Sequence, residues 1–566
     1  MKKSILTILL LILGIATLCF SACNKTSTVI TPYPDTDPNA SKTEGIKKLS
    51  VPTVTRKDAE SDLSSLTFSW ETVAEADYYE AVVSVGENVK YTCAVTETEF
   101  TLDEQYIDEL GKYVISVFAK DADNTYAPSV GTYTLNVTRG SMEKFPIEIS
   151  TPEQFIAIET FPDGFFRLTN DIDFSGVAYQ PICAGDSAFA GCLDGNGYSL
   201  KNVTLVSDKN KIEYDLYVGV FGRIYYGTVK NLKIENFSSN SPALYYTGEE
   251  YIGTLAGLNI GGVTENVTVI NSNINWNTFR NLGSPLYCVG GLFGMLCEDA
   301  TVSGCVVNVN VALSTPFNEN FYTDASGIIT STDYTYGYFS SLFVGGIAGS
   351  AQITKKIAKD MTIEKCSTSG NITAQGNVLA TGGFLGHVSV ASTLKQPYQT
   401  VIYDSLSTCS FAVSEEDGYP FNGDFKKYIG LAVGKADFIV MKRCYLNVFV
   451  KTQNISFDDV PTGYIPESNA LALVATFGFV GYGHGQAGSA DTSPRPRVFV
   501  DCYYNTEKIT QNVDYFTKIG SFKKDIYQEG SIEIIALDES DISSKDSFEG
   551  FDFENVWKWD NAPVLR

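Results

Sequence analysis

The stretch YCVGGLFGMLCEDATVSGCVVNV, from Tyr287 to Val309, sets a glycine doublet and a third glycine ahead of Cys305. The same pattern of glycines, short apolar runs and a second half with one small residue recurs along the chain. Related stretches begin at Tyr217, Tyr251, Phe343, Ala380 and Tyr428, and a decayed copy pairs ALVATFGFV with VFVDCYYN. A constant core with insertions of unequal length between its copies is typical of a stacked solenoid.

When the second halves of these units are aligned, one position in each unit forms a common column of small side chains. This column decides how Cys305 is interpreted. The column contains Leu232, Val267, Cys305, Cys366, Ser405, Cys444 and Cys502. A reactive nucleophile would not be replaced by leucine, valine or serine in sister copies. The pattern therefore predicts that Cys305 is packed in a narrow interior position and is not part of a chemical site.

Each unit also offers short strands whose apolar residues would be buried when coil stacks on coil. We expect Leu292, Phe293, Val302 and Val306 to be among them. The glycines are expected where the chain turns a corner or where successive backbones approach closely. These features predict an all-β chain with a parallel β-helix as its main domain.

The repeats resemble the GLUG-type repeats of bacterial surface proteins, and the segment FAGCLDGNGYSLKNVTL resembles the lead-in that often precedes them. The resemblance covers about Ile147 to Asn505. It implies a right-handed β-helix displayed at the cell surface, in proteins that are often adhesin-like or associated with glycans.

The N-terminus has the layout of a secretory signal, with Lys2 and Lys3 followed by an apolar run and then Ser21 and Ala22 before Cys23. Small residues directly before a cysteine resemble the lipobox of bacterial lipoproteins, although Phe20 departs from the usual leucine. The resemblance implies cleavage before Cys23 and lipid attachment to its sulfur. We expect an outer-membrane lipoprotein, exposed on the surface, whose partner in the membrane is its own lipid.

Short alternating strands between about Lys47 and Arg139 predict a β-sandwich. Trp70 on an early strand and Tyr113 near the start of the sixth strand resemble the fibronectin type III pattern of the immunoglobulin-like fold. Such a module usually acts as a spacer, and a carbohydrate-binding sandwich is the alternative. The predicted divisions are a signal peptide at 1–22, a linker at 23–46, the sandwich at 47–139, the β-helix at 145–505 and a C-terminal cap at 506–566.

The ends of the β-helix also carry signals. Thr151, Pro152 and Gln154 predict the start of a short helix with a capping box, which would cover the first coil. Trp557, Trp559 and Leu565 are expected to pack on the last coil and protect its open edge, with an aromatic ligand platform as the alternative reading.

Composition limits the classes of partner. The net charge of −25 and the lack of a compensating basic stretch argue against nucleic acid as a partner. The cysteines are far apart and contain no C-x-x-C pair, so we expect buried free thiols and neither a zinc site nor another metal or cofactor. A monomer is expected.

Catalytic signals are sparse. Asp458 and Asp459 precede His484 in an order that loosely resembles the polygalacturonase family, but its Asn-Thr-Asp and Arg-x-Lys elements are missing, and Arg495–Arg497 replaces them poorly. Asp171 and Asp173 could be calcium ligands of a lyase, yet ordinary exposed acids are the better interpretation. His387 is interpreted as a turn residue. We therefore predict no catalytic residues.

Binding is the function that remains. Insertions at 314–341 and from Ser414 to Tyr428 mix aromatic rings with amides and carboxylates, a combination that suits glycans, although the same rings could simply pack the loops. The favoured hypothesis is a lipid-anchored, adhesin-like envelope protein that binds glycans or host surface ligands through loops of the β-helix. The alternatives are a polysaccharide lyase or glycoside hydrolase on the same scaffold, and a structural subunit of a surface complex.

Overall fold

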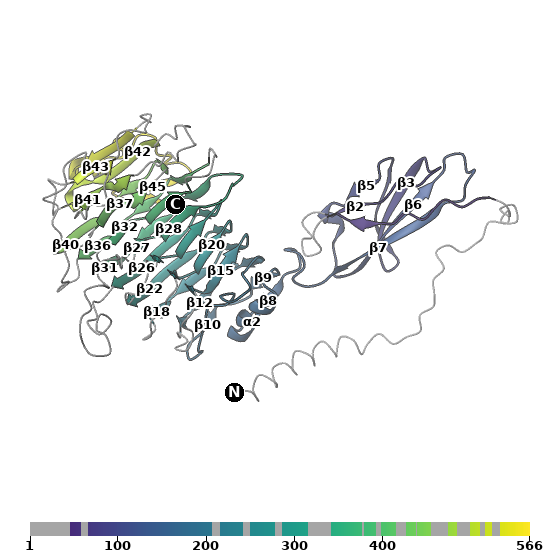
Figure 1. The fold of residues 1–566 in the computed structure, drawn as a ribbon, viewed down its shortest axis with the longest axis horizontal. Helices are drawn as coiled ribbons and strands as arrows, with labels where there is room; N and C mark the ends of the chain where they lie inside the picture. Colours follow the sequence, from purple (N-terminus) through teal and green to yellow (C-terminus); the bar gives the residue numbers. More distant parts are fainter. Residues whose placement is uncertain are drawn as a thin grey trace, which may run out of the picture. The chain divides into compact units, whose positions relative to one another are not determined.

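The computed structural model describes residues 46–57, 66–205, 215–241, 249–277, 286–314, 341–375, 378–391, 398–414, 426–436, 439–453, 474–483, 498–509, 516–522 and 532–566. These residues form two compact units. The first ends at Leu135, and the second is formed mainly by Asn136–Arg566 (Figure 1). Both units are built almost wholly of β-strands.

The first unit contains two antiparallel sheets. One is formed by β1 (Thr55–Arg56), β2 (Thr67–Ser69) and β5 (Glu99–Thr101), and the other by β4 (Asn88–Val95), β3 (Tyr78–Val85), β6 (Gly111–Lys120) and β7 (Ser129–Val137). The rings of Phe68 and Tyr133, one from each sheet, have their centroids 5.5 Å apart. Trp70 and Tyr113 are both buried, and Tyr113 lies on the sixth strand, as the sequence predicts. The unit is therefore a sandwich with an aromatic core.

The second unit opens with β8 (Ile147–Ile149) and the helix α2 (Pro152–Ile156). The Thr151 side chain accepts a hydrogen bond from the backbone N–H of Gln154, which confirms the predicted cap. Gln154 Oε1 accepts from the backbone N–H of Ser150 at 2.8 Å, one residue earlier than a capping box requires. Phe155 of the helix lies against Phe174 of the first coil, with ring centroids 5.8 Å apart.

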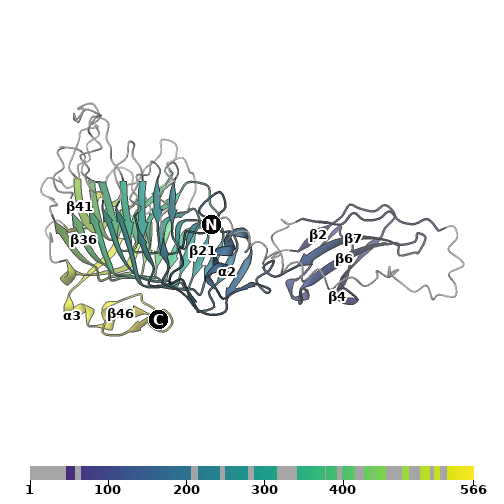
Figure 2. The same ribbon diagram turned by 90° about the horizontal axis from the view of Figure 1, so that it is seen from below.

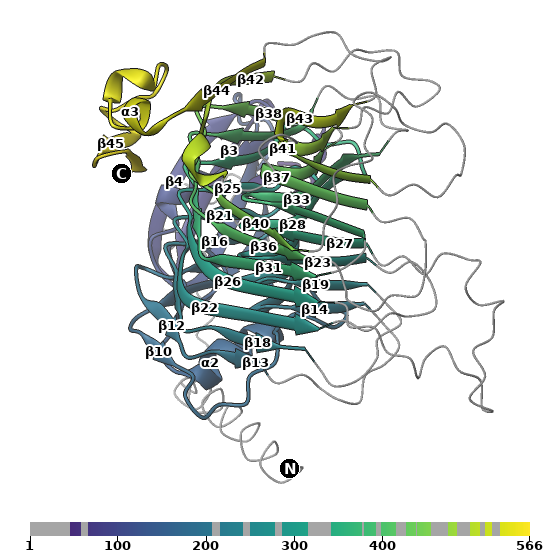
Figure 3. The ribbon, with the colours of Figure 1, turned by 90° about the vertical axis from the view of Figure 1, so that its left-hand side faces the viewer.

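Beyond this helix the chain passes repeatedly through the same set of strands, and each pass pairs in parallel with the next (Figure 3). Two columns of strands form a 13-stranded sheet. The first column contains β14 (Leu216–Val218), β19 (Glu250–Ile252), β23 (Leu286–Gly290), β27 (Ser341–Gly345) and β32 (Val378–Gly382). The second contains β15 (Phe221–Tyr225), β20 (Ala256–Ile260), β24 (Phe293–Cys297), β28 (Ala348–Ile353) and β33 (Leu385–Val390). Both columns continue into β37 (Lys426–Ala436), β41 (Val474–Gly483) and β43 (Phe516–Phe522).

Three further columns belong to a 24-stranded sheet, which also includes β9 (Phe165–Leu168) and β10 (Ile172–Asp173). The third column contains β11 (Cys192–Asp194), β16 (Thr228–Lys230), β21 (Val263–Glu265), β25 (Thr301–Ser303), β29 (Met361–Glu364), β34 (Thr400–Tyr403), β38 (Ile439–Lys442) and β42 (Val498–Asn505). The fourth contains β12 (Ser199–Lys201), β17 (Lys233–Glu235), β30 (Ser367–Ser369), β35 (Leu406–Ser407) and β39 (Tyr445–Leu446). The fifth contains β13 (Thr204–Leu205), β18 (Ser238–Asn240), β31 (Asn371–Gln375), β36 (Ser410–Ser414) and β40 (Phe449–Gln453), while the longer β22 (Thr268–Asn277) and β26 (Val306–Ser314) span the fourth and fifth.

This arrangement is a parallel solenoid of stacked coils around one apolar core, in agreement with the repeat pattern. The stack runs further than Asn505, because β43 pairs with β41 and β44 (Ile532–Leu537) pairs with β42. Of the repeat glycines, β43 keeps one, Gly520, which is aligned with Gly481 of β41, and β44 carries none. This loss explains why the pattern ended before the coils did.

The seven residues of the predicted column, which we call the corner column, are all fully buried. The thiol of Cys305 lies 3.3 Å from the carbonyl oxygen of Ser303, and that of Cys366 lies 3.2 Å from the carbonyl oxygen of Glu364. The Ser405 hydroxyl donates to the carbonyl of Tyr403 at 2.6 Å. Cysteine and serine are interchangeable here because both satisfy the carbonyl two residues earlier.

The residue before each corner-column position is in the left-handed region of backbone conformation. Its φ is 53° at Asn231 and Asn266, 62° at Gly304 and 46° at Asp404. This sharp corner directs the next side chain into the core. The residue after the corner-column position then points outward. The prediction that Val306, which follows Cys305, is buried is therefore wrong, because its side chain is 43% exposed.

The repeat glycines mark close approaches of the backbone. A Cβ atom on Gly290 would lie 2.1 Å from the carbonyl oxygen of Phe293, and one on Gly294 would lie 2.4 Å from the backbone nitrogen of Ile252 in the preceding coil. No side chain fits at either position without a backbone shift, which confirms the predicted role of these glycines.

The C-terminal segment folds into α3 (Glu539–Ile542), β45 (Trp557–Trp559) and β46 (Pro563–Leu565) (Figure 2). Trp557 is fully buried and stacks on Phe551 at 4.4 Å between ring centroids. This cluster includes Tyr445 and Tyr503, which lie on the last coils, and Trp559 and Leu565 pack at its border. The predicted packing is present, but it covers the side of these coils and not the open strand edge.

Candidate functional site

The outward side of the fifth column is the most regular polar surface of the solenoid. Along β18, β22, β26, β31 and β36, alternate residues are buried, among them Ile274, Val311 and Ile372, and the residues between them point outward. Figure 3 shows these strands lying side by side. We call the outward residues the amide face: Ser238, Asn240, Asn273, Asn275, Asn277, Asn310, Ala312, Ser314, Asn371, Thr373, Gln375, Ser410, Ala412 and Ser414.

Hydrogen bonds between coils order the amide face. Asn310 Nδ2 donates to Asn273 Oδ1 at 3.0 Å, and Asn371 donates to Asn310 Oδ1 from its side chain at 3.2 Å and from its backbone at 3.0 Å. At the next outward position along the strands, the Ser314 hydroxyl donates to Asn277 Oδ1 at 2.6 Å. The polar groups of the face are therefore held in fixed positions before any ligand arrives.

The amide face carries no charged side chain, although charged residues make up 19% of the chain. The third column of the same sheet is different. Its outward residues, matched coil by coil, include Lys230, Glu265, Ser303, Glu364 and Lys442. We call this the charged column. The lack of charge on the amide face is a local property of five neighbouring strands.

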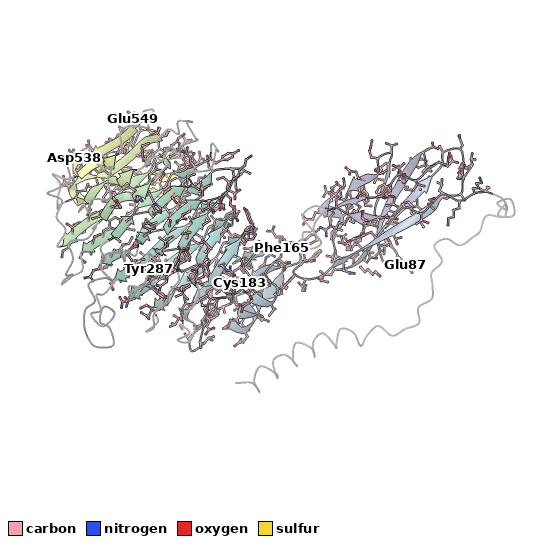
Figure 4. The ribbon with its side chains drawn as sticks, viewed as in Figure 1. Glu87, Phe165, Cys183, Tyr287, Asp538 and Glu549 are labelled. Atoms are coloured by element: carbon pink, nitrogen blue, oxygen red, sulfur yellow. The ribbon has the colours of Figure 1, made fainter. Side chains whose placement is uncertain are left out.

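A buried acid that the sequence analysis missed lies on the inner side of β19. Glu250 is 5% exposed and aligned with the buried Tyr287, which Figure 4 labels. Its carboxylate accepts a hydrogen bond from the indole N–H of Trp276. Burial raises the pKa of Glu250 to about 7, because a charge in the apolar core is poorly solvated. The sequence did contain a signal for this buried acid. Glu250 occupies a repeat position at which the neighbouring coils have Leu216 and Tyr287.

His387 lies within β33, so its interpretation as a turn residue is wrong. The ring stacks on Phe343 with centroids 4.3 Å apart, and Nδ1 lies 3.3 Å from Ser350 Oγ. Burial holds the pKa of His387 well below its usual value, and nearby Lys435 adds to the effect. The neutral ring packs as part of the sheet, against Phe343 of β27 and Ser350 of β28.

The two acids proposed as calcium ligands have other partners. Asp171 pairs with Lys201 at 2.7 Å, and Asp173 accepts hydrogen bonds from Ser175 and Asn202. These contacts lower the pKa of both carboxyl groups, and both acids are exposed. Within the described ranges, no group of three or more histidine, cysteine or acidic side chains is placed to hold a metal ion.

Several predicted features lie outside the described residues. They are Cys23, Asp458, Asp459, His484, Arg495–Arg497 and most of the two long insertions. Tyr428, at the end of the second insertion, is described and lies buried in β37 with the Lys435 ammonium 6.0 Å from its ring centroid. In the part of the chain that the structure covers, no helix is long and apolar enough to cross a membrane.

The ten described cysteines are free, and all but Cys93 are buried. Burial raises the pKa of the Cys183 thiol to about 12 and that of Cys192 to about 11. Since the thiolate is the reactive form, a raised pKa makes Cys183 and Cys192 poor nucleophiles. This confirms the prediction that most of the thiols are buried.

Comparisons with known proteins assign no family. No family model matches the chain. Halomucin of Haloquadratum walsbyi is 29% identical over 208 residues, which is 33% of this chain but only 2% of that protein. A crystal structure of a candidate immunoglobulin A1 protease from Bacteroides ovatus aligns with 76% of this chain and 94% of its own at 13% identity and a TM-score of 0.35. A pectate lyase from Pectobacterium carotovorum aligns with 66% of this chain and 87% of its own at 10% identity and a TM-score of 0.12.

Proposed function

We propose that this chain is a lipid-anchored protein of the cell envelope that acts as an adhesin, binding glycans or host surface ligands through its solenoid. The observation that carries the proposal is the amide face, a continuous and ordered set of hydrogen-bonding groups that extends over successive coils. Hydrogen-bonding groups that are already ordered favour binding, because less freedom is lost when the ligand arrives, whereas catalysis requires converging acids or a nucleophile.

The finer features of the architecture belong to the same proposal. We take the solenoid to be a right-handed β-helix of the GLUG type, because its glycines and corner column recur as that repeat implies. We take the sandwich to be a fibronectin type III-like spacer, supported by the buried positions of Trp70 and Tyr113. The chain is proposed to be a monomer.

The proposal differs from the initial hypothesis about where the ligand binds. The sequence pointed to the insertions between coils, whereas the amide face lies on the strands themselves. Sites on strands hold their groups more rigidly than sites on loops, which favours the face as the binding surface.

Binding is tested with the full-length protein, expressed in a bacterial envelope and extracted in detergent. The protein is applied to a glycan array and, in parallel, to an array of host surface proteins. Specific retention on either array supports the adhesin proposal. Retention on neither, together with release of reducing ends or unsaturated products from polysaccharides, would establish the enzyme alternative instead.

The lipid anchor is tested separately. The variant Cys23→Ser is expected to leave the membrane fraction, because the acyl chains that hold the protein to the bilayer would be attached at that sulfur. A Cys19→Ser variant, which alters a cysteine inside the proposed signal peptide, is the matched control and should stay with the membrane. If Cys23→Ser also stays there, the anchor assignment is wrong.

A further inference from the structure

We propose that the amide face binds an uncharged polysaccharide whose chain runs across the strands, along the axis of the coil stack. This inference rests on the proposed binding function and adds to it the surface and the chemical class of the ligand.

The charge pattern selects a neutral ligand. The chain has a net charge of −25, so its overall field repels polyanions such as acidic polysaccharides and nucleic acids. A cationic or zwitterionic partner would find no carboxylate on the amide face to pair with. An uncharged surface within an acidic protein is therefore complementary to an uncharged ligand.

The groups on the face match sugar hydroxyls. A sugar hydroxyl both donates and accepts hydrogen bonds, and so do the amides and hydroxyls of the face. An amide nitrogen has two N–H groups, and the bond from Asn310 to Asn273 uses one of those of Asn310. Thr373 and Ser410 add hydroxyls on the two coils that follow, both on the solvent side of their strands.

The repeat favours a polymer over a folded protein partner. Neighbouring strands lie about 4.8 Å apart, so equivalent groups recur at that interval along the stack. Aligned positions such as Asn273, Asn310, Asn371 and Ser410 present the same kind of group on successive coils. A polysaccharide also repeats its hydroxyls along its length, and many weak contacts made together give useful affinity.

The end of the face supplies an aromatic ring. Phe449 of β40 is aligned with Ser410 and is 38% exposed. An exposed ring beside hydroxyl and amide groups suits stacking on the apolar side of a sugar ring. Lys451, aligned with Ala412, is the first charged residue met in this direction and marks where the neutral surface stops.

The test measures binding of the full-length protein to a neutral β-glucan, a neutral mannan and a neutral galactan, with polygalacturonate as the charged comparison. The double variant Thr373→Asp with Ser410→Asp places two charges on neighbouring coils of the face, near the end that Phe449 borders. Its affinity for the neutral polysaccharide that the unaltered protein binds is expected to fall roughly tenfold or more, because carboxylates must be desolvated there. Thermal unfolding of each variant is recorded to show that the fold is retained.

The matched control is Ser303→Asp, which adds a charge at a half-exposed serine of the charged column, between Glu265 and Glu364. It should bind the neutral polysaccharide as the unaltered protein does. Binding only to polygalacturonate or only to a protein would overturn this inference while leaving the adhesin proposal intact, as would neutral binding that the double variant does not weaken. Failure to bind any glycan or protein would overturn both.

Discussion

The corner column and the amide face are built from the same coils, and both repeat once per coil, yet they place opposite demands on the sequence. The corner column is fully buried and varies among leucine, valine, cysteine and serine. The amide face is exposed or half-exposed and varies among asparagine, serine, threonine and glutamine, with alanine in two places. Inside, uncharged side chains that range in size from serine to leucine fill the corner; outside, uncharged polar side chains predominate and face the solvent.

This difference shows why a conspicuous motif can be misleading in a solenoid. The glycines and Cys305 recur because backbones must approach closely and a small side chain must fill the corner. The groups available to a ligand recur on the other side of the same strands, without any conspicuous motif. Substitutions should separate the two regions, since changes at the corner affect folding and changes on the face affect binding.

The largest separation is expected from adding the same charge to each region. Cys366→Asp would bury a carboxylate without a cationic partner and should lower the free energy of unfolding by more than about 3 kcal/mol. Ser410→Asp, on the amide face, should change it by less than about 0.5 kcal/mol. Chemical denaturation measures both. Equal losses would mean that the two regions are not distinct in the way described.

Glu250 provides a test of the inner side that depends on pH. Its pKa is raised from 4.5 to about 7 in the folded protein, so the unfolded chain releases this proton first as the pH rises. The free energy of unfolding therefore falls by about 3 kcal/mol as the pH rises from 4.5 to 7, because the unfolded chain has lost this proton while the folded chain still holds it. Above pH 7 this contribution changes little. Glu250→Gln should remove this part of the pH dependence, which is measured by denaturation at pH 5 and pH 8.

The control for this experiment is Glu265→Gln, which removes a carboxylate from the charged column on the outer side. If Glu250→Gln and Glu265→Gln show the same change between the two pH values, the buried position of Glu250 is not responsible for it.

The glycine doublet gives a smaller effect on the same side. Gly290→Ala would place a Cβ atom 2.1 Å from the carbonyl oxygen of Phe293 and should cost about 2 kcal/mol. Gly185→Ala is the control, because a Cβ atom there has nothing within 4 Å. The melting temperature should fall for the first and hold for the second. A neutral Gly290→Ala would contradict the close approach of the Gly290 backbone to Phe293 in its own coil and to Ala348 in the next.

The smallest effect is expected for Cys305→Ser, since Ser405 already fills the same column and bonds to the carbonyl of Tyr403. The free energy of unfolding should change by less than about 1 kcal/mol, and binding should be unchanged. Loss of binding with stability retained would restore a chemical role for this cysteine.

Much of the fold could be predicted from the sequence, because a solenoid repeats its local constraints. Gly290, Gly294 and the corner column each recur in sister copies, so the coils and the buried thiols could be identified. The orientation of Val306 could not be predicted, because it depends on the left-handed corner at Gly304. That corner shifts the alternation of inward and outward side chains by one residue. The position of His387 was missed for a similar reason: it follows a repeat glycine that lies within a strand.

The candidate site was harder to predict than the fold. The pairing of Asn273 with Asn310 joins residues on different coils, and the length of the insertions hides their alignment in the sequence. The neutrality of the face becomes visible only when strands far apart in the chain are set side by side. Glu250 was overlooked because an acid in a strand ordinarily points to solvent.

The most direct test of the account is a thiol footprint of the two outer surfaces. Ser410→Cys and Ser303→Cys are each made in a Cys93→Ser background, where the other described cysteines are buried. The rate of labelling by a soluble maleimide is then measured with and without the neutral polysaccharide that the protein binds. The account predicts that the polysaccharide slows labelling at position 410 and leaves it unchanged at position 303. Equal rates at position 410 with and without saturating polysaccharide would contradict it.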